Sequence, residues 1–72
     1  MSTLAKINRL LKKMGREERL TRGNGYFYIA ESPISGLYMN SLGNDEKSME
    51  IAVDFVNETI SAIDGESFKL VV

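Results

Sequence analysis

The segment from Arg22 to Ile29 constrains the fold of this chain more than any other. It reads Arg-Gly-Asn-Gly-Tyr-Phe-Tyr-Ile, a Gly-Asn-Gly turn that leads directly into alternating aromatic and apolar residues. Asn-Gly supplies the positive φ angles of a tight two-residue turn, and the residues after it are strong strand formers. The segment therefore predicts a β-hairpin whose second strand carries Tyr26 and Tyr28 on one face.

Amphipathic helices are expected on both sides of this hairpin in the sequence. Apolar residues at three- and four-residue spacing predict one helix over roughly residues 3–14 and another over about residues 46–63. Small polar residues before each pattern and a glycine after it predict where each helix begins and ends. These residues are Ser2 or Thr3 with Gly15 for the first helix, and Asn44 or Asp45 with Gly65 for the second.

Three short strands are expected between the helices, over residues 17–22, 26–31 and 37–42, with a Pro- and Gly-containing loop before the third. Residues 67–72 predict either a short fourth strand or a tail of which only Phe68 docks. The expected fold is one α+β domain over residues 1–72. It has an N-terminal helix, a three-stranded antiparallel sheet, and a second helix packed on the same face of that sheet.

Strand alternation predicts which face of the sheet is buried, because successive side chains point to opposite faces. The predicted buried set is Phe27, Ile29, Leu37, Met39, Val53, Val56 and Ile60. Alternation then leaves all three tyrosines of the chain, Tyr26, Tyr28 and Tyr38, on the open face. Arg22 is expected at the rim of that face, with Arg19 and Thr21 joining from the first strand. Three tyrosines on one open face are typical of a binding surface.

Charge is divided unevenly along the chain. Residues 1–22 carry +5 and residues 23–72 carry −6. Either a basic helix lies near an acidic helix and the two neutralise each other, or two charged surfaces face different partners. Within the second helix, an acidic stripe recurs at four-residue steps, formed by Glu50, Asp54 and Glu58. This stripe is either a solvated helix face or a second partner-binding surface.

The chemistry of the chain argues against catalysis. It has no histidine, cysteine or tryptophan, which removes the commonest general base, the thiol nucleophiles and nearly all transition-metal ligands. The Gly-rich turn is not a phosphate loop, because it lacks the Lys-Ser/Thr pair and a strand follows it. We expect no enzymatic activity, no cofactor and no metal site. Without an apolar run of membrane-spanning length or a signal peptide, we expect a cytoplasmic protein without membrane partners.

The hairpin segment is similar to the central strand motif of the RNA-recognition motif, Lys/Arg-Gly-aromatic-Gly-aromatic-Val-x-aromatic. The match covers Arg22, Gly23, Gly25 and Tyr26. Asn24 stands where that family stacks a base, and Ile29 replaces an aromatic residue. The resemblance implies that Tyr26 is a base-stacking residue.

A longer part of the chain, roughly residues 4–60, resembles small proteins encoded by phages and prophages. The shared order is a basic helix, Arg-Gly-x-Gly-Tyr-Phe-Tyr, a Ser/Gly loop, a strand containing Tyr38 and an amphipathic helix. The tryptophan associated with the last helix of that family is missing from this chain. Most such proteins have no assigned function, so the resemblance implies a mobile-element source more than a mechanism.

Three functional hypotheses follow from these features. In the first, the protein binds a host or phage protein and inhibits or modulates its complex through the tyrosine face, with the acidic stripe as a second surface. In the second, it binds single-stranded nucleic acid by stacking bases on the tyrosines, with arginines and the basic helix on the phosphates. The overall charge of −1 opposes that hypothesis. In the third, the chain forms a homodimer by pairing its apolar helix stripes; the alternative is that both stripes pack on their own sheet.

Overall fold

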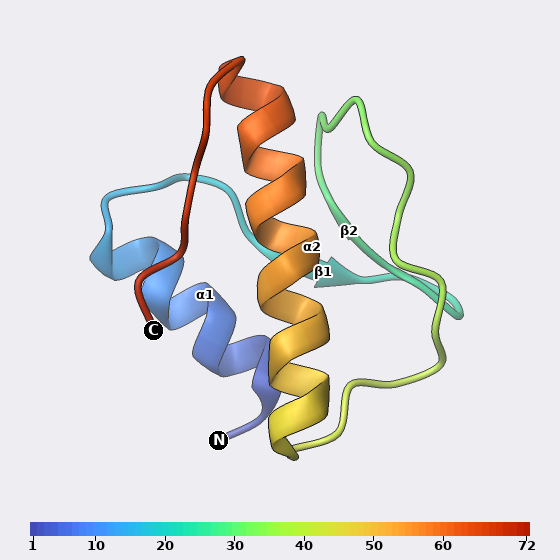
Figure 1. Ribbon diagram of the computed structural model, residues 1–72. Helices are drawn as coiled ribbons and strands as arrows, with labels where there is room; N and C mark the ends of the chain where they lie inside the picture. The colour runs from blue at the N-terminus through green and yellow to red at the C-terminus, as the bar shows by residue number, and fades with distance from the viewer.

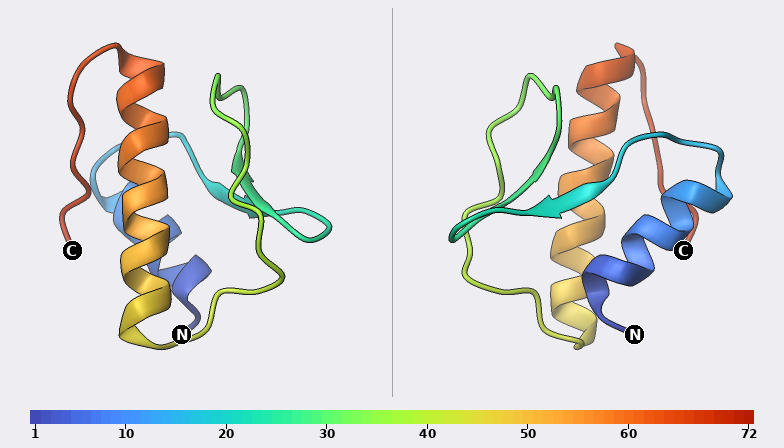
Figure 2. Two further views of the ribbon diagram at one scale, coloured as in Figure 1. Left: turned by 45° about the vertical axis from the view of Figure 1, so that its right-hand side comes forward. Right: turned by 180° about the vertical axis from the view of Figure 1, so that it is seen from behind.

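The computed structural model describes all residues, 1–72, as two helices and a β-hairpin. In chain order these are α1 (Thr3–Lys13), β1 (Leu20–Arg22), β2 (Phe27–Ile29) and α2 (Glu46–Asp64). The fold is therefore α+β, as expected. Figure 1 shows α2 running across the molecule, with α1 and the C-terminal tail on one side of it and the hairpin on the other. Both views in Figure 2 show the hairpin tip projecting away from the helices.

Local signals set the bounds of both helices. The Ser2 hydroxyl accepts a hydrogen bond from the Ala5 amide and caps α1, while the Asp45 carboxylate accepts from the Ser48 amide and caps α2. This bond network lowers the pKa of Asp45, chiefly through the hydroxyl of Ser48. Each helix is followed by a glycine at positive φ, as the sequence predicts, at Gly15 and Gly65.

The hairpin forms as predicted, but with shorter strands. Leu20 pairs with Ile29, Thr21 with Tyr28, and Arg22 with Phe27. Gly25 has a φ of 80°, whereas Asn24 keeps a negative φ. The turn therefore needs one left-handed residue instead of the two expected from the Asn-Gly pair.

Further backbone contacts lie at the open end of the hairpin, where β1 begins and β2 ends. Asn8 of α1 takes both backbone groups of Leu20: its amide oxygen accepts from the Leu20 amide at 2.7 Å, and its amide nitrogen donates to the Leu20 carbonyl at 2.9 Å. The Asn8 side chain therefore covers the edge of β1 that faces away from β2, at Leu20, the first residue of the strand. At the end of β2, the Ser32 amide donates to the Ile29 carbonyl and Glu31 takes a φ of 62°, so the chain turns away.

The predicted third strand over residues 37–42 is wrong: only one bridge forms, between Leu37 and Phe27. The two residues exchange backbone hydrogen bonds of 2.8 and 2.7 Å, and no further pairing follows. Gly43 explains the loss, because its carbonyl accepts from the Thr3 hydroxyl and its amide donates to Ser48 at 3.0 Å. These bonds hold residue 43 between the starts of the two helices and draw the preceding residues off the sheet.

Residues 67–72 form a tail along α2, and the alternative of a fourth strand is wrong. Backbone amides of the tail donate to helix side chains: Phe68 to the Ser61 hydroxyl at 2.9 Å, and Leu70 to the Asn57 amide oxygen at 2.7 Å. The docked residue is also different from the one expected. Leu70 is 3% exposed, whereas Phe68 is only half-buried.

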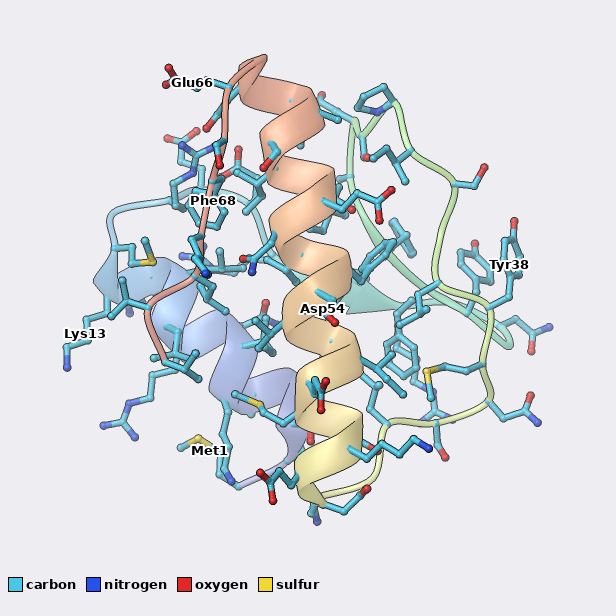
Figure 3. All side chains as sticks on the ribbon, in the orientation of Figure 1. Met1, Lys13, Tyr38, Asp54, Glu66 and Phe68 are labelled. Atoms are coloured by element: carbon cyan, nitrogen blue, oxygen red, sulfur yellow. The ribbon has the colours of Figure 1, made fainter.

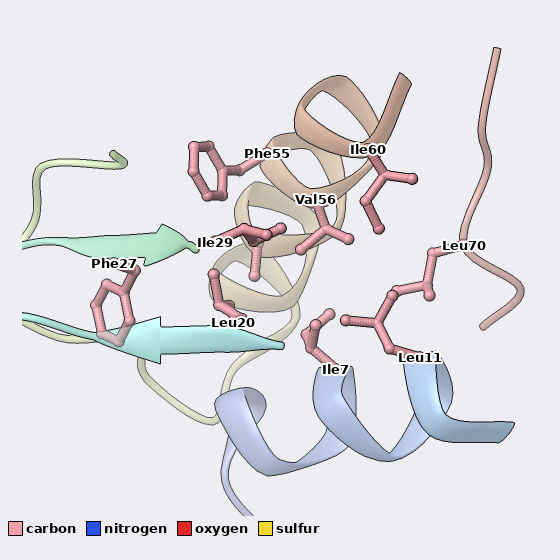
Figure 4. Packing of buried hydrophobic residues seen from close by; sticks show 10 residues of the cluster. Ile7, Leu11, Leu20, Phe27, Ile29, Phe55, Val56, Ile60 and Leu70 are labelled. Carbon is pink, nitrogen blue, oxygen red and sulfur yellow. The ribbon is translucent and has the colours of Figure 1, made fainter. Parts of the chain in front are cut away.

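One apolar core joins the helices, the hairpin and the tail (Figure 4). Its members are Ile7, Leu11, Leu20, Phe27, Ile29, Ala52, Phe55, Val56, Ile60 and Leu70. Leu20, Phe27 and Ile29 share one face of the hairpin by register, and that face packs on residues from both helices. Three residues predicted to be buried, Leu37, Met39 and Val53, are half-buried at the margin of this core.

Candidate binding surface: the tyrosine cluster

The three tyrosines come together on the side of the hairpin away from the core. Tyr26 lies in the middle, with its ring centre 5.5 Å from that of Tyr28 and 5.8 Å from that of Tyr38. The rings are tilted by 38° and 37°, an arrangement that aromatic pairs favour. Tyr38 is 75% exposed, while the other two rings are half-buried. We call these three residues the tyrosine cluster; Figure 3 shows Tyr38 at the outer edge of the molecule.

Two glycines make room for the central ring of this cluster. A Cβ atom at Gly23 would overlap the Tyr26 ring, and one at Gly36 would come within 3.0 Å of Tyr26 Cδ2 and 2.8 Å of the Phe27 carbonyl oxygen. Neither glycine has a positive φ. The turn alone therefore does not explain Gly23, because its lack of a side chain lets the Tyr26 ring lie against the backbone.

Arginines take a smaller part in this surface than expected. Register places Arg22 opposite Phe27, on the face of the buried residues, and its guanidinium donates to the Asn40 carbonyl at 3.3 Å beyond the end of the core. Arg19 folds back and donates to the carbonyls of Arg16 and Glu18 at 2.6 and 2.7 Å. On β1, Thr21 is the residue that pairs with Tyr28 and shares its face.

The acidic stripe lies on a different surface. Glu50, Asp54 and Glu58 are all exposed on α2, and none of them forms an ion pair. Figure 3 shows Asp54 on the outer side of α2, apart from Tyr38. The structure therefore divides the predicted site residues among three places: the tyrosine cluster, the acidic stripe on α2, and Arg22 on the core-facing side of the hairpin.

A polar cluster around Arg16 was not expected from the sequence. Its guanidinium forms ion pairs of 2.8 Å with both Glu18 and Asp64, and lies 5.3 Å from the ring centre of Phe68. Hydrogen bonds from Arg16 lower the pKa of Glu18, and the two carboxylates raise the pKa of Arg16. No periodic signal marks these residues, because they come from three separate segments. Their arrangement joins the end of α1 to the end of α2 and to the tail.

A polar hollow of about 390 Å³ lies between β1, the end of β2 and the end of α2. Its lining includes Glu17, Glu18, Arg19 and Glu31, but two of these groups already bind within the chain: Glu18 binds Arg16, and Arg19 binds backbone carbonyls. No group of three or more acidic side chains converges closely enough to hold a metal ion. No helix combines the length and apolar character that crossing a membrane requires.

The chain has no match among models of protein families, curated proteins or solved structures.

Proposed function

We propose that this is a small non-enzymatic binding protein that contacts a host or phage protein through the tyrosine cluster. The observation that carries the proposal is a contiguous surface of three tyrosine rings whose outermost member is 75% exposed. Tyrosine combines a large apolar ring with a polar tip and is enriched among residues that dominate binding energy. The mobile-element source is a prediction from the resemblance, whereas the inhibitory or modulatory role is a prediction from the small size of the chain, its lack of catalytic groups and its two candidate surfaces.

The distribution of charge favours a protein partner over a nucleic acid. If the protein bound single-stranded nucleic acid, the exposed cations of α1 would have to hold the phosphates of the bases stacked on the tyrosines. Figure 3 shows Lys13 of α1 and Tyr38 on opposite sides of the molecule. Arg19 is bound to backbone carbonyls, and Arg22 lies on the opposite face of the hairpin, where it donates to the Asn40 carbonyl. The rings also contact one another, which leaves less space for bases between them. Since phosphate contacts dominate nucleic-acid affinity, this surface suits a protein better.

The test is a double variant, Tyr28→Ala/Tyr38→Ala. We avoid Tyr26 because it packs against both neighbouring rings and two glycines, so that its removal would also disturb the turn. Immobilised protein is used to capture partners from a bacterial lysate, and bound proteins are compared by mass spectrometry. A specific partner should bind the parent and be lost from the double variant.

A matched control is Ile63→Ala, which removes apolar surface from a residue that is 37% exposed at the far end of α2. This variant should retain the partner, and both variants should melt near the parent temperature. A double variant that is folded and still captures the partner would refute the proposal.

The nucleic-acid alternative is tested by titration with single-stranded DNA and RNA at two salt concentrations. We expect no saturable binding. Binding that weakens steeply with salt and disappears in the tyrosine double variant would replace the proposed function with the alternative.

A further inference from the structure

An apolar groove runs along the side of the molecule opposite the tyrosine cluster. It consists of two adjoining hollows of about 470 and 370 Å³ between α1, the first turns of α2 and the tail. We call it the seam groove. Its apolar lining residues are Met1, Leu10, Met14, Met49, Val71 and Val72. Val71 and Val72 are 69% and 76% exposed. Clustered apolar side chains with this exposure mark interaction surfaces more often than isolated ones do.

The two rims of the seam groove carry opposite charge. Lys6, Arg9 and Lys13 of α1 line one side. Glu46, Glu50 and Asp54 of α2 line a third hollow of about 300 Å³ on the other side, which shares Met49 and Val72 with the groove. The ion pairs of the chain are those of Arg16 with Glu18 and Asp64, so none of these six rim residues is paired.

From this arrangement we propose that the seam groove binds a second copy of the chain as a two-fold symmetric dimer. A two-fold axis parallel to the groove places the basic rim of each copy opposite the acidic rim of the other, and tail against tail. Such an interface is self-complementary, because every contact occurs twice. Apolar side chains at the centre and charged groups at the rim are the usual composition of a protein interface.

The mixed charge selects this occupant over others. A membrane surface would attract the basic rim but repel the acidic rim, and both rims lie beside the same apolar lining. A nucleic acid is disfavoured for the same reason. The dimer also differs from a pairing of the main helix stripes, since Ile7, Leu11, Val56 and Ile60 are already buried within the chain.

Dimerisation through this face leaves the tyrosine clusters free. In Figure 3, Met1 and Lys13 lie on one side of the molecule and Tyr38 on the other. A dimer would therefore present two tyrosine clusters pointing outward, which raises apparent affinity for a partner that is itself symmetric or repeated.

The test reverses the charge of one rim at a time. Variant one is Lys6→Glu/Arg9→Glu, which makes both rims acidic; variant two is Glu50→Lys/Asp54→Lys, which makes both rims basic. Each is measured by sedimentation and light scattering over a range of protein and salt concentrations. The parent should dimerise, and each variant alone should dimerise more weakly by on the order of tenfold or more, because its rims repel. An equimolar mixture of the two variants should form a heterodimer, because the acidic rims of variant one then face the basic rims of variant two.

Controls carry the same charge change away from the groove. They are Lys12→Glu/Lys47→Glu for variant one and Glu58→Lys/Glu66→Lys for variant two; all four residues are exposed and none lines the groove. These controls should dimerise like the parent. A parent that remains monomeric at millimolar concentration would overturn the proposal, as would a dimer that both rim variants retain or a mixture that fails to associate.

Discussion

Removal of the Phe27 side chain should destabilise this fold more than any other single truncation of an aromatic residue. Phe27 is 2% exposed and belongs to the core that joins the hairpin to both helices. Its backbone lies opposite Arg22 of β1 in the register, and its amide and carbonyl both form hydrogen bonds with Leu37. A Phe27→Ala variant keeps these backbone bonds but leaves a cavity in the core.

The expected cost follows from the size of the buried ring. Phe→Ala substitutions in cores cost about 3–5 kcal/mol. A chain of 72 residues has a total stability of roughly 4–11 kcal/mol, at about 0.05–0.15 kcal/mol per residue. The variant should therefore lose a large part of its stability, with a fall in Tm of roughly 12–40 °C for a domain of this size.

Urea denaturation followed by circular dichroism measures this loss. Phe68→Ala is the matched control, because it truncates the same residue type at a half-buried position on the tail and should cost only about 1–2 kcal/mol. A Phe27→Ala variant within 1 kcal/mol of the parent, or more stable than Phe68→Ala, would show that Phe27 does not face the core.

Three further predictions concern single positions. Gly25→Val should cost about 1–3 kcal/mol in urea denaturation, because φ is 80° where space is otherwise open; Gly25→Asn should cost less. Thr59→Val should raise stability by about 1 kcal/mol, since the buried Thr59 hydroxyl has no hydrogen-bond partner; an unchanged or lower Tm would contradict this. The hydrogen bond from Arg16 lowers the pKa of Glu18 from its ordinary value of 4.5. The stabilisation of the fold by ionised Glu18 is therefore complete well above that pH and is lost as the pH falls through the lowered pKa. A Glu18→Gln variant should therefore lose less stability than the parent between pH 5 and 3, which pH-dependent melting curves will show.

The features that sequence predicts correctly here are those set by neighbouring residues. The hairpin position depends on the turn and on the strand formers that follow it, and its faces depend on alternation. Helix ends depend on side chains within one turn, such as Asp45 and Gly65. The grouping of the three tyrosines was also predictable, even though the third strand was not, because one bridge at Leu37 suffices to bring Tyr38 beside Tyr26.

The features that sequence analysis missed depend on contacts between distant segments. Thr3 and Ser48 hold Gly43, and nothing in the pattern of residues 37–42 indicates that these bonds end the pairing. The tail is similar, because its amides bind Asn57 and Ser61 on α2 instead of another strand. An alternating sequence is compatible with a strand, but whether a strand forms depends on which partner is within reach.

Gly23 shows how a correct local pattern can have an incomplete interpretation. The Gly-Asn-Gly segment does form a turn, yet only Gly25 needs a left-handed backbone. Gly23 instead admits the Tyr26 ring, as Gly36 does from the other side. Of the residues shared with the RNA-recognition motif, at least two thus have a structural reason in this chain that involves no ligand.

In the structure, the uneven charge of the chain becomes a basic helix, α1, beside an acidic helix, α2. The basic and acidic helices pack together, which agrees with the first alternative, but their rim charges do not pair within the chain. Exposed ion pairs contribute only about 0–1 kcal/mol each, so folding alone gives little reason to keep acids on one helix and bases on the other. Charge patterns have a larger effect on the choice and orientation of partners. Opposite charges on the two sides of one apolar groove are therefore better explained by recognition of a surface with the reverse arrangement, and a second copy of this chain turned about a two-fold axis presents that arrangement.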